Sequence, residues 1–337
     1  MFLNDPESDC NSMANDDTLY LGIDLGGTNI RCGLVTGTNK VIARDSTKTK
    51  SVEGSEAVIK RIVKLCENVA AEAGVKKSEI DGLGIGAPGA IDIRTGTVIR
   101  AVNLGWKNYP LKEALEDQVK WPVTVDNDAN VAAWGEYRAG AGRKLKKCDS
   151  LLAVWVGTGV GGGLILNDKI HHGFRLTAGE IGHTIVRSGA GRGRRSLEDL
   201  AGRNNLVAML TRLIQTGHES KMTKIVDGDY SKVRSKALAT ALAENDPLTL
   251  ELVQQAAMAV GQAIASTITL LGLPAVILGG GVVEALGDRF VGWVREAFDD
   301  AVFPLALRDT KIVASELDDD AGVIGSALLA SDENKKR

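Results

Sequence analysis

The sequence predicts an α/β fold made of two related halves. Apolar runs short enough for strands alternate with longer segments in which apolar residues recur at helical spacing. A strand, a glycine-rich turn and a second strand occur twice, first around Gly26 and again around Gly161, which indicates duplicated halves. The chain of 337 residues is also long enough for two domains or one large one.

Composition narrows the class of protein. Hydrophobic residues make up 44% and charged residues 25%, as in ordinary soluble globular proteins. The net charge of −3 gives no indication of nucleic acid or a membrane surface as partner. We expect no transmembrane helix, because no apolar run reaches the required length of about 18 residues. The 39 glycines indicate many tight turns near ligands.

The cysteines and the N-terminal segment bear on location. Four cysteines, at positions 10, 32, 66 and 148, are scattered, and none has the C-x-x-C spacing. Neither a zinc site nor a disulfide framework is therefore indicated, and a reducing cytoplasm is the expected location. Residues 1–17 are polar and acidic, unlike a signal peptide, and predict a disordered tail.

The first strand is expected at residues 18–24 and ends in Asp24-Leu25-Gly26-Gly27-Thr28-Asn29. Strands at 30–35 and near 41–44 follow, so the segment is at least a hairpin. Its turn also has the form of an anion nest, because glycines let backbone N–H groups approach phosphate oxygens closely. Asp24 would then lie within reach of the accompanying Mg²⁺. No GxxxxGK[ST] nucleotide loop occurs in the chain.

A helix is expected at residues 55–73, followed by a strand at 82–85 and the turn Gly86-Ala87-Pro88-Gly89. Turns at the carboxyl ends of strands are where α/β sheets present loops to ligands, although a plain turn fits equally well. Asn103 comes soon after, and its amide offers the donor and the acceptor that suit a sugar hydroxyl.

The central stretch Val125-Asp126-Asn127-Asp128-Ala129-Asn130 joins a strand at 123–125 to a helix that starts near Ala129. Aspartate and asparagine at such a junction cap the helix N-terminus, and capping alone explains the cluster as well as chemistry does. The mid-chain position and the glycine-rich turns on both sides favour the chemical role.

A second copy of the strand–turn–strand unit follows, with a strand at 149–156, the turn Gly157-Thr158-Gly159-Val160-Gly161-Gly162-Gly163 and a strand at 164–166. Five glycines in seven residues cost much chain entropy, which argues against a purely structural role. We expect the adjacent His171 and His172 in a loop rather than as metal ligands.

Glu180 and His183 are three residues apart, so they face one side of a helical turn. The glycine-rich loop after them carries four arginines, which most simply form a solvated basic loop: Arg187, Arg192, Arg194 and Arg195. The remaining elements are expected as a helix from Leu197, mostly helical structure at 204–260 with an interruption at 227–230, a long helix at 248–271, a strand at 275–278 before Gly279-Gly280-Gly281, a helix at 286–298, a strand at 311–314 and a capped helix at 319–330.

Together these motifs resemble the ROK family of sugar kinases, repressors and open reading frames, and most closely its bacterial ATP-dependent glucokinases. The matching stretches lie in family order between residues 18 and 330: 24–29, 125–130, 157–163, 179–183 and 278–281. The resemblance implies the two-domain actin-like, ribonuclease-H-like fold with an interdomain cleft. It further implies an N-terminal domain at 18–126, a C-terminal domain at 127–318 and a helix at 319–330 that returns to the first domain. A homodimer is common in the family.

The resemblance also implies a role for each matching residue. Asp128 resembles the base that activates the sugar hydroxyl attacking ATP, and Asp24 would hold Mg²⁺ through water. The implied sugar ligands are Gly89, Asn103, Asn127, Asp128, Glu180, His183 and Glu198. The implied phosphate and nucleotide contacts are Asp24, Gly26, Gly27, Thr28, Thr158, Gly159, Gly279, Gly280 and Gly281.

One departure from the family concerns zinc. Many members hold a structural zinc through three loop cysteines and the histidine of the Gly-Glu-Ile-Gly-His motif. The corresponding positions here are Gly189, Gly191 and Ser196, which supply no thiolate, so we expect no zinc of this type. The loop arginines would then hold the loop by pairing with carboxylates or backbone carbonyls.

Two classes of function remain at this point. The first is a hexose kinase, most simply a glucokinase, and the second is a sugar-responsive regulator. Family regulators carry a helix-turn-helix before the core, whereas only 17 polar residues precede the first strand here, which favours the kinase. N-acetylhexosamine kinase, fructokinase and polyphosphate glucokinase are alternatives. The preferred hexose, the phosphoryl donor and the oligomeric state are left open.

Overall fold

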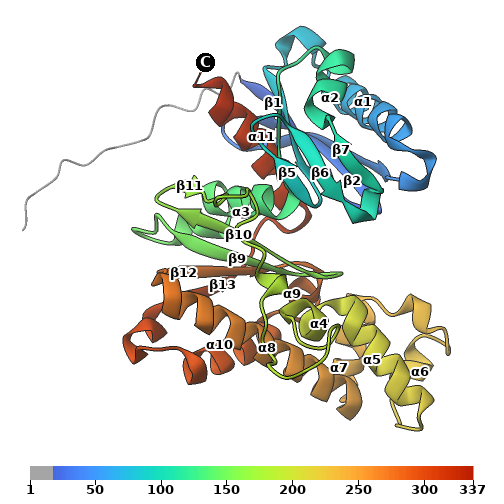
Figure 1. The fold of residues 1–337 in the computed structure, drawn as a ribbon. Coiled ribbons are helices and arrows are strands. Elements are labelled where there is room, and N and C mark those ends of the chain that lie inside the picture. Colours follow the sequence, from blue (N-terminus) through green and yellow to red (C-terminus); the bar gives the residue numbers. More distant parts are fainter. Residues whose placement is uncertain (1–17, 337) are drawn as a thin grey trace, which may run out of the picture.

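The computed structural model describes residues 18–336 and shows two lobes, each built on one large sheet (Figure 1). The predicted tail at 1–17 lies outside the described residues. The first sheet has five strands. Their order across the sheet is β3 (Val41–Lys48), β2 (Asn29–Thr36), β1 (Leu19–Leu25), β4 (Gly82–Ala87) and β8 (Val123–Asn127). Strands β1, β4 and β8 are parallel, while β2 and β3 form antiparallel pairs.

The second sheet repeats this arrangement. Its order is β11 (Lys169–Ile170), β10 (Val160–Leu166), β9 (Leu151–Val156), β12 (Ala275–Gly279) and β13 (Lys311–Ala314). Again one edge is antiparallel and the other three strands are parallel. The strand order therefore confirms the prediction of two related halves.

The first lobe also contains a small third sheet and two helices. The third sheet, β5 (Ala90–Asp92), β6 (Thr97–Ala101) and β7 (Trp106–Tyr109), was not expected from the sequence, and neither was α2 (Leu111–Val119). Helix α1 (Ser55–Glu72) agrees with the prediction, because its apolar residues form one buried face. That face includes Val58, Ile62, Leu65 and Val69, which belong to the core of this lobe.

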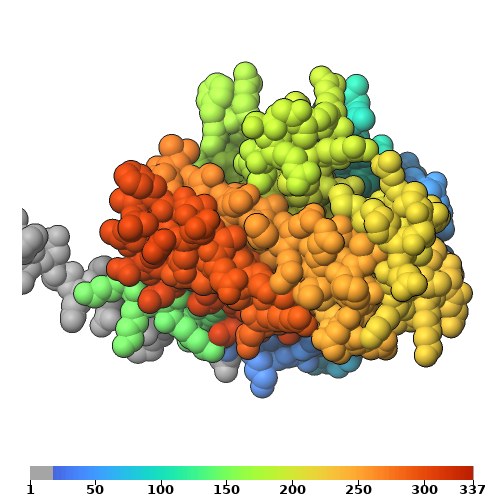
Figure 2. Space-filling model, turned by 90° about the horizontal axis from the view of Figure 1, so that it is seen from below, coloured from blue at the N-terminus to red at the C-terminus, as the bar shows by residue number. Residues whose placement is uncertain are grey.

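Helices cover the far side of the second sheet, as Figure 2 shows from below in yellow, orange and red. They are α4 (Leu197–Ala201), α5 (Arg203–Gln215), α6 (Met222–Ile225), α7 (Ser235–Ala243), α8 (Pro247–Leu271), α9 (Gly281–Leu286) and α10 (Asp288–Ala301). The helix expected at 286–298 is in fact the pair α9 and α10, which Gly287 separates at a φ of 57°.

Helix α8 runs through the centre of the second lobe. Asp246 caps it by accepting a hydrogen bond from Thr249 N, Pro247 occupies its first turn, and Gly272 ends it at a φ of 64°. No helix within residues 18–336 is both long and apolar enough to cross a membrane.

Helices α3 (Asp128–Arg138) and α11 (Ala321–Asn334) lie where the two lobes meet (Figure 1). Glycines make this packing close: a Cβ at Gly22 would lie 1.9 Å from the Val323 carbonyl oxygen, and one at Gly84 would lie 1.7 Å from that of Ser326. The last helix thus packs directly on β1 and β4. It starts at Ala321 rather than 319 and has no side-chain cap.

Helix α3 contacts both large sheets. A Cβ at Gly86 of β4 would lie 2.3 Å from Val131 Cγ2, and a Cβ at Gly163 of β10 would lie 2.5 Å from Ala133 Cβ. Because one helix serves both lobes, the division of the chain into domains near residue 126 stays a prediction.

Candidate active site

A pocket of about 350 Å³ opens between the two lobes, and we call it the interlobe pocket. It brings together residues that are far apart in the sequence, and most of them belong to the motifs described above. The lining residues are Asp24, Asp128, Ala129, Ala132, Trp155, Gly157, Thr158, Gly159, Val160, Gly161 and Glu198.

Strand register explains why the two acidic motifs meet. In the parallel part of the first sheet, Asp24 of β1 pairs with Gly86 of β4, and Gly86 pairs with Asp126 of β8. The carboxyl ends of these strands therefore lie at one edge of the sheet. Asp128 follows Asp126 by two residues, as the first residue of α3, so its side chain reaches the same pocket as Asp24.

Asp128 is half-buried, and its Oδ1 accepts a hydrogen bond of 2.9 Å from Ala129 N. Burial raises the pKa of Asp128 to about 6, and the negative charges of Asp24 and Glu180 add to this effect. A carboxylate with a pKa of this size is ionised at neutral pH yet basic enough to accept a proton from a hydroxyl in a transition state.

Asp24 lies 3.2 Å from the Arg31 guanidinium, which also pairs with Asp319 at 2.7 Å. Burial nevertheless raises the pKa of Asp24, against the opposing effect of Arg31. Two carboxylates that repel each other in one pocket fit a hard cation such as Mg²⁺. Residues 18–336 contain no cluster of three or more histidine, cysteine, aspartate or glutamate side chains suited to a metal. A magnesium ion here would therefore take most of its ligands from water and phosphate.

The first glycine turn is rigidly built. Gly26 N donates to Asn29 O at 2.9 Å, and Thr49 Oγ1 donates to Gly26 O at 2.6 Å. A Cβ at Gly27 would lie 3.0 Å from Asn103 Cβ, so this predicted sugar ligand stands directly against the turn. Thr28 O accepts from Thr49 N at 2.9 Å. Of this motif only Asp24 lines the interlobe pocket.

The second glycine turn lies across the pocket from Asp24. Thr158 Oγ1 accepts a hydrogen bond of 2.9 Å from Arg203 Nη2, which brings a positive charge beside the turn. Glu198 crosses over Gly159: its Oε2 accepts from Val160 N at 2.9 Å, and a Cβ at Gly159 would lie only 2.1 Å from that oxygen. Glycine at 159 is thus what lets Glu198 reach the turn.

Asn127 is the N-cap of α3, with its Oδ1 accepting from Ala129 N at 2.9 Å and from Asn130 N at 3.3 Å. Its Nδ2 donates to Gly89 O at 3.0 Å. Gly89 has a φ of 92°, and a Cβ there would lie 2.1 Å from Arg100 O, so only glycine fits. The structure therefore joins two of the predicted sugar ligands directly.

His183 is the last residue of a short 3-10 turn, η5 (Ile181–His183), and Glu180 directly precedes this turn. Their side chains face each other at 3.9 Å, as the spacing predicted, and they are 50% and 72% exposed. Neither lines the interlobe pocket, although the charge of Glu180 acts on the pKa of Asp128. They form an open rim next to the base.

The third glycine turn, Gly279-Gly280-Gly281, ends β12 and starts α9. A Cβ at Gly279 would lie 2.2 Å from the ring of Trp155, and Gly280, at a φ of 89°, lies against Val156. This turn does not line the interlobe pocket, but it stands beside the end of β9, from which the second glycine turn continues.

The loop that lacks the zinc ligands of the family is held by main-chain hydrogen bonds. Val186 N and Arg187 N donate to Arg195 O at 2.9 and 3.1 Å. At its end Ser196 and Asp199 form a capping box, and Asp199 Oδ2 also accepts from Arg195 N at 3.0 Å. Within the described residues, the groups that donate to Asp199 Oδ2 are the main-chain N–H groups of Arg195 and Ser196. The expectation that the arginine side chains hold this loop was therefore wrong.

Two site residues were missed by the sequence analysis. Trp155 Nε1 donates to Ala129 O at 3.1 Å, which ties the second lobe to the first turn of α3, and Arg203 supports Thr158. Neither residue belongs to a motif, and only the folded chain brings Trp155 to the pocket and Arg203 to Thr158, which lines it. His172 lies in a loop after β11, as expected, and its ring lies 2.6 Å from Asp126, a contact that the sequence did not indicate.

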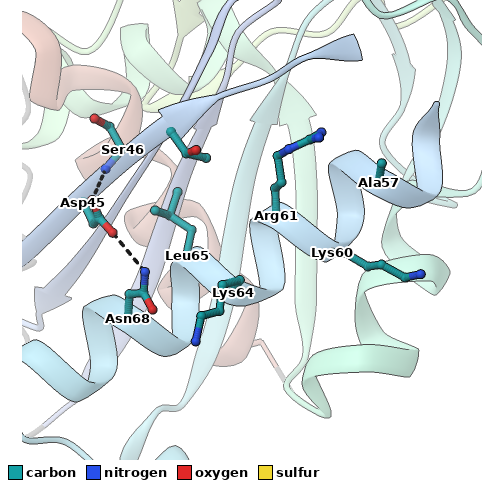
Figure 3. A pocket seen from close by; sticks show the side chains of 9 residues that line it. Asp45, Ser46, Ala57, Lys60, Arg61, Lys64, Leu65 and Asn68 are labelled. Carbon is teal, nitrogen blue, oxygen red and sulfur yellow. Dashed lines mark hydrogen bonds between the residues drawn. The ribbon is translucent and has the colours of Figure 1, made fainter. Parts of the chain in front are cut away.

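A second pocket, of about 430 Å³, lies between α1 and β3, away from these motifs (Figure 3). Its polar groups largely serve one another: Arg61 donates to Thr49 O at 3.0 Å and pairs with Glu53, while Asp45 accepts from Asn68 at 3.3 Å. None of the predicted site residues lines it. The interlobe pocket is therefore the candidate active site.

Comparisons with known proteins show the family of the chain. Residues 20–333 match the ROK family. A glucokinase of Halalkalibacterium halodurans is 33% identical, over 94% of this chain and 96% of that protein. A xylose repressor of Caldicellulosiruptor bescii is 29% identical, over 93% of this chain and 78% of the repressor.

The solved structures that resemble the fold include a ROK family glucokinase of Streptomyces griseus in complex with glucose and AMPPNP. It is 29% identical, covers 93% of this chain and 99% of its own, and superposes with a TM-score of 0.81. Since the family match spans nearly all of the sequence, the chain belongs to the ROK family and has the two-domain, actin-like fold of its sugar kinases.

Proposed function

We propose that the protein transfers the γ-phosphoryl group of ATP to a hydroxyl of a hexose, most simply glucose to give glucose 6-phosphate. One observation carries the proposal. Asp128, with a pKa raised to about 6, lies in a pocket that also contains Asp24 and the second glycine turn, and these come from opposite lobes. A general base between two anion-binding turns is the arrangement that phosphoryl transfer to an alcohol needs.

The chemistry assigned to the residues is simple. Asp128 accepts the proton of the sugar hydroxyl as the hydroxyl oxygen attacks the γ-phosphorus, and ADP leaves with the electron pair of the broken P–O bond. Backbone N–H groups at Gly27, Thr28, Thr158 and Gly159 hold the phosphates, with the charge of Arg203 nearby, while Gly26 N closes the first turn by its bond to Asn29 O. Bound magnesium, held through water at Asp24, would neutralise phosphate charge.

Sugar recognition would fall to the groups around Asp128. Asn127 and Asn103 offer amide donors and acceptors, while Glu180 and Glu198 offer carboxylates, so each can bind a hydroxyl. Glu180 and His183 are half exposed or more in this structure, so closure of the lobes on a sugar would bury them. The turn at 279–281 would contact adenosine.

The related proteins support glucose and ATP in particular. The relative from Halalkalibacterium halodurans is named a glucokinase, and the Streptomyces griseus structure holds glucose and AMPPNP.

The proposal also includes the location and the assembly of the protein. Cys32, Cys66 and Cys148 are free thiols, which supports the expected reducing cytoplasm. A homodimer, common in the family, is part of the proposal, and sedimentation of the purified protein tests it.

A sugar-responsive regulator is the second candidate, and the similarity to a xylose repressor favours it. Such a protein would bind the sugar without transferring phosphate. Other kinases of the family, for N-acetylhexosamine or fructose, or with polyphosphate as donor, would use the same base. These alternatives differ in substrate rather than in the arrangement of the interlobe pocket.

The test is an assay of ADP release with a panel of hexoses and N-acetylhexosamines. ATP and polyphosphate serve as alternative donors, with sugar phosphate detected directly for the latter. We expect the fastest turnover with glucose and ATP, and turnover lower by about 10²-fold or more with Asp128→Asn. Sugar binding without turnover for any sugar and donor would refute the kinase and favour the regulator.

A further inference from the structure

Asp126 is a buried carboxylate directly behind the proposed base. It is 2% exposed, and its Oδ1 accepts hydrogen bonds from Asn127 N at 2.6 Å and from Asn130 Nδ2 at 3.1 Å. These two partners flank Asp128 in the sequence. One oxygen of Asp126 therefore fixes the backbone on one side of the base and the first turn of α3 on the other.

The second oxygen of Asp126 is bound by the other lobe. His172 Nε2 lies 2.6 Å from Asp126 Oδ2, and its side chain is 19% exposed. A carboxylate oxygen can only accept, so the ring nitrogen donates. His172 follows β11, whereas Asp126 belongs to β8, so this hydrogen bond crosses between the lobes. The neighbouring His171 is exposed.

The main chain of His172 serves the sugar side of the site. Its carbonyl oxygen accepts from Ala178 N at 3.0 Å, which closes the loop that leads into Gly179 and Glu180. Gly179 packs tightly on β10, because a Cβ there would lie 2.8 Å from Gly162 O. The start of the Glu180 turn is thus anchored to His172 and to the second sheet.

We propose that His172 is a positioning residue that links the two sides of the sugar site. Its ring holds Asp126, and through it Asn127 and Asp128, while its carbonyl holds the loop before Glu180. His172 itself touches neither sugar nor nucleotide. This inference rests on the proposed kinase function, since the geometry it sets is that of the base relative to a sugar ligand.

Three substitutions test the proposal. His172→Gln keeps an amide N–H at about the position of Nε2 and can still reach Asp126. His172→Leu fills a similar space but cannot donate, and His171→Leu is the matched control on the adjacent exposed residue. We expect His172→Leu to lower kcat and raise the KM for glucose, with a combined loss of up to about 10²-fold, because misplacement of the reacting groups by about 1 Å has effects of that size.

The KM for ATP should stay unchanged in His172→Leu, which a general loss of folded protein would not explain. His172→Gln should recover most of the loss, and His171→Leu should match the wild type. Wild-type constants in His172→Leu would overturn the proposal. Equal impairment of the glutamine and leucine variants at equal thermal stability would overturn it as well.

Two further measurements keep the test decisive. If His172→Leu does not fold, His172→Asn replaces it, because the shorter amide stops near the position of Nδ1. Equal activity of the asparagine and glutamine variants would then refute the positioning role of His172.

Hydrogen exchange at amides 127–130 and 178–180 tests the link without any turnover. If the wild type phosphorylates no sugar, the proposed function fails, while faster exchange in His172→Leu than in His171→Leu still supports the positioning role and equal exchange refutes it.

Discussion

Replacing the proposed base by its amide should make the protein more stable while it removes activity. The folded structure raises the pKa of Asp128 from 3.8 to about 6, through burial and through the charges of Asp24 and Glu180. Each tenfold change in acidity corresponds to about 1.4 kcal/mol, so keeping this carboxylate ionised at pH 7 costs the folded state up to about 3 kcal/mol. Solvent screens part of this at a half-buried side chain, and we expect Asp128→Asn to gain about 1–3 kcal/mol.

The sign of the pH dependence follows from the direction of the shift. A carboxyl group whose pKa is raised on folding stabilises the folded state fully below its ordinary pKa of 3.8, and this contribution is lost as the pH rises through about 6. The asparagine side chain resembles the protonated acid at every pH. The gain in stability of Asp128→Asn over the wild type should therefore be complete above about pH 7 and absent below about pH 4.

Thermal unfolding of both proteins near pH 7.5 and pH 4, without sugar or magnesium, measures the effect. A gain of this size corresponds to a rise in Tm of roughly 2–6 °C at the higher pH. Turnover should fall by about 10² or more. The control is Asp117→Asn on the exposed face of α2, where a surface change should stay within about 0.5 kcal/mol. An unchanged or lower Tm of Asp128→Asn at pH 7.5, or a gain in Tm that persists at pH 4, would refute the electrostatic reasoning. Near-normal turnover of this variant would show that Asp128 is not the base and serves only as the first residue of α3.

Three other predictions concern the same site. Asp24→Ala should raise the magnesium concentration needed for half-maximal turnover severalfold, since the pocket loses a carboxylate; an unchanged requirement would make this turn structural. In the wild type, kcat/KM for the sugar should fall about tenfold per pH unit below about pH 6 as Asp128 is protonated, and a flat profile down to about pH 5 would contradict its role. The purified protein should contain no stoichiometric zinc, and glucose should slow hydrogen exchange at residues 184–197; one zinc per chain, or equal exchange with and without glucose, would contradict the two halves of this prediction.

The spacing of apolar residues along the chain was enough to predict the bounds of some helices and strands. The helix expected at 55–73 forms at Ser55–Glu72, and the strand expected at 311–314 forms at Lys311–Ala314. Strand β10 shows where local chemistry misleads. The strand starts at Val160 rather than at 164. The reason is that Gly161, Gly162 and Gly163 pair with β9 in the sheet instead of belonging to the turn. Helix α3 presses on this strand at Gly163, where a Cβ would lie 2.5 Å from Ala133 Cβ.

The parts that the sequence did not predict depend on contacts between distant residues. Strands β5, β6 and β7 have three to five residues each and mixed burial, so they carry no strong alternation. The bond between Asp126 and His172 joins residues 46 positions apart, and nothing in either local stretch indicates it. Most of the site motifs, in contrast, could be found because they lie at the ends of strands, at 24–29, 125–130, 157–163 and 278–281, whereas the motif at 179–183 lies in a loop.

The helix-capping and chemical interpretations of Asn127 are not alternatives. Its Oδ1 caps α3, and its Nδ2 donates to Gly89 O, so both ends of the amide hold parts of the proposed sugar site together. Aspartate would cap the helix equally well but could not donate to Gly89. An amide has two N–H donors, and within residues 18–336 only one of them is used. The cap therefore fixes Asp128 as the first residue of the helix and leaves one donor for a hydroxyl of the proposed sugar beside the proposed base.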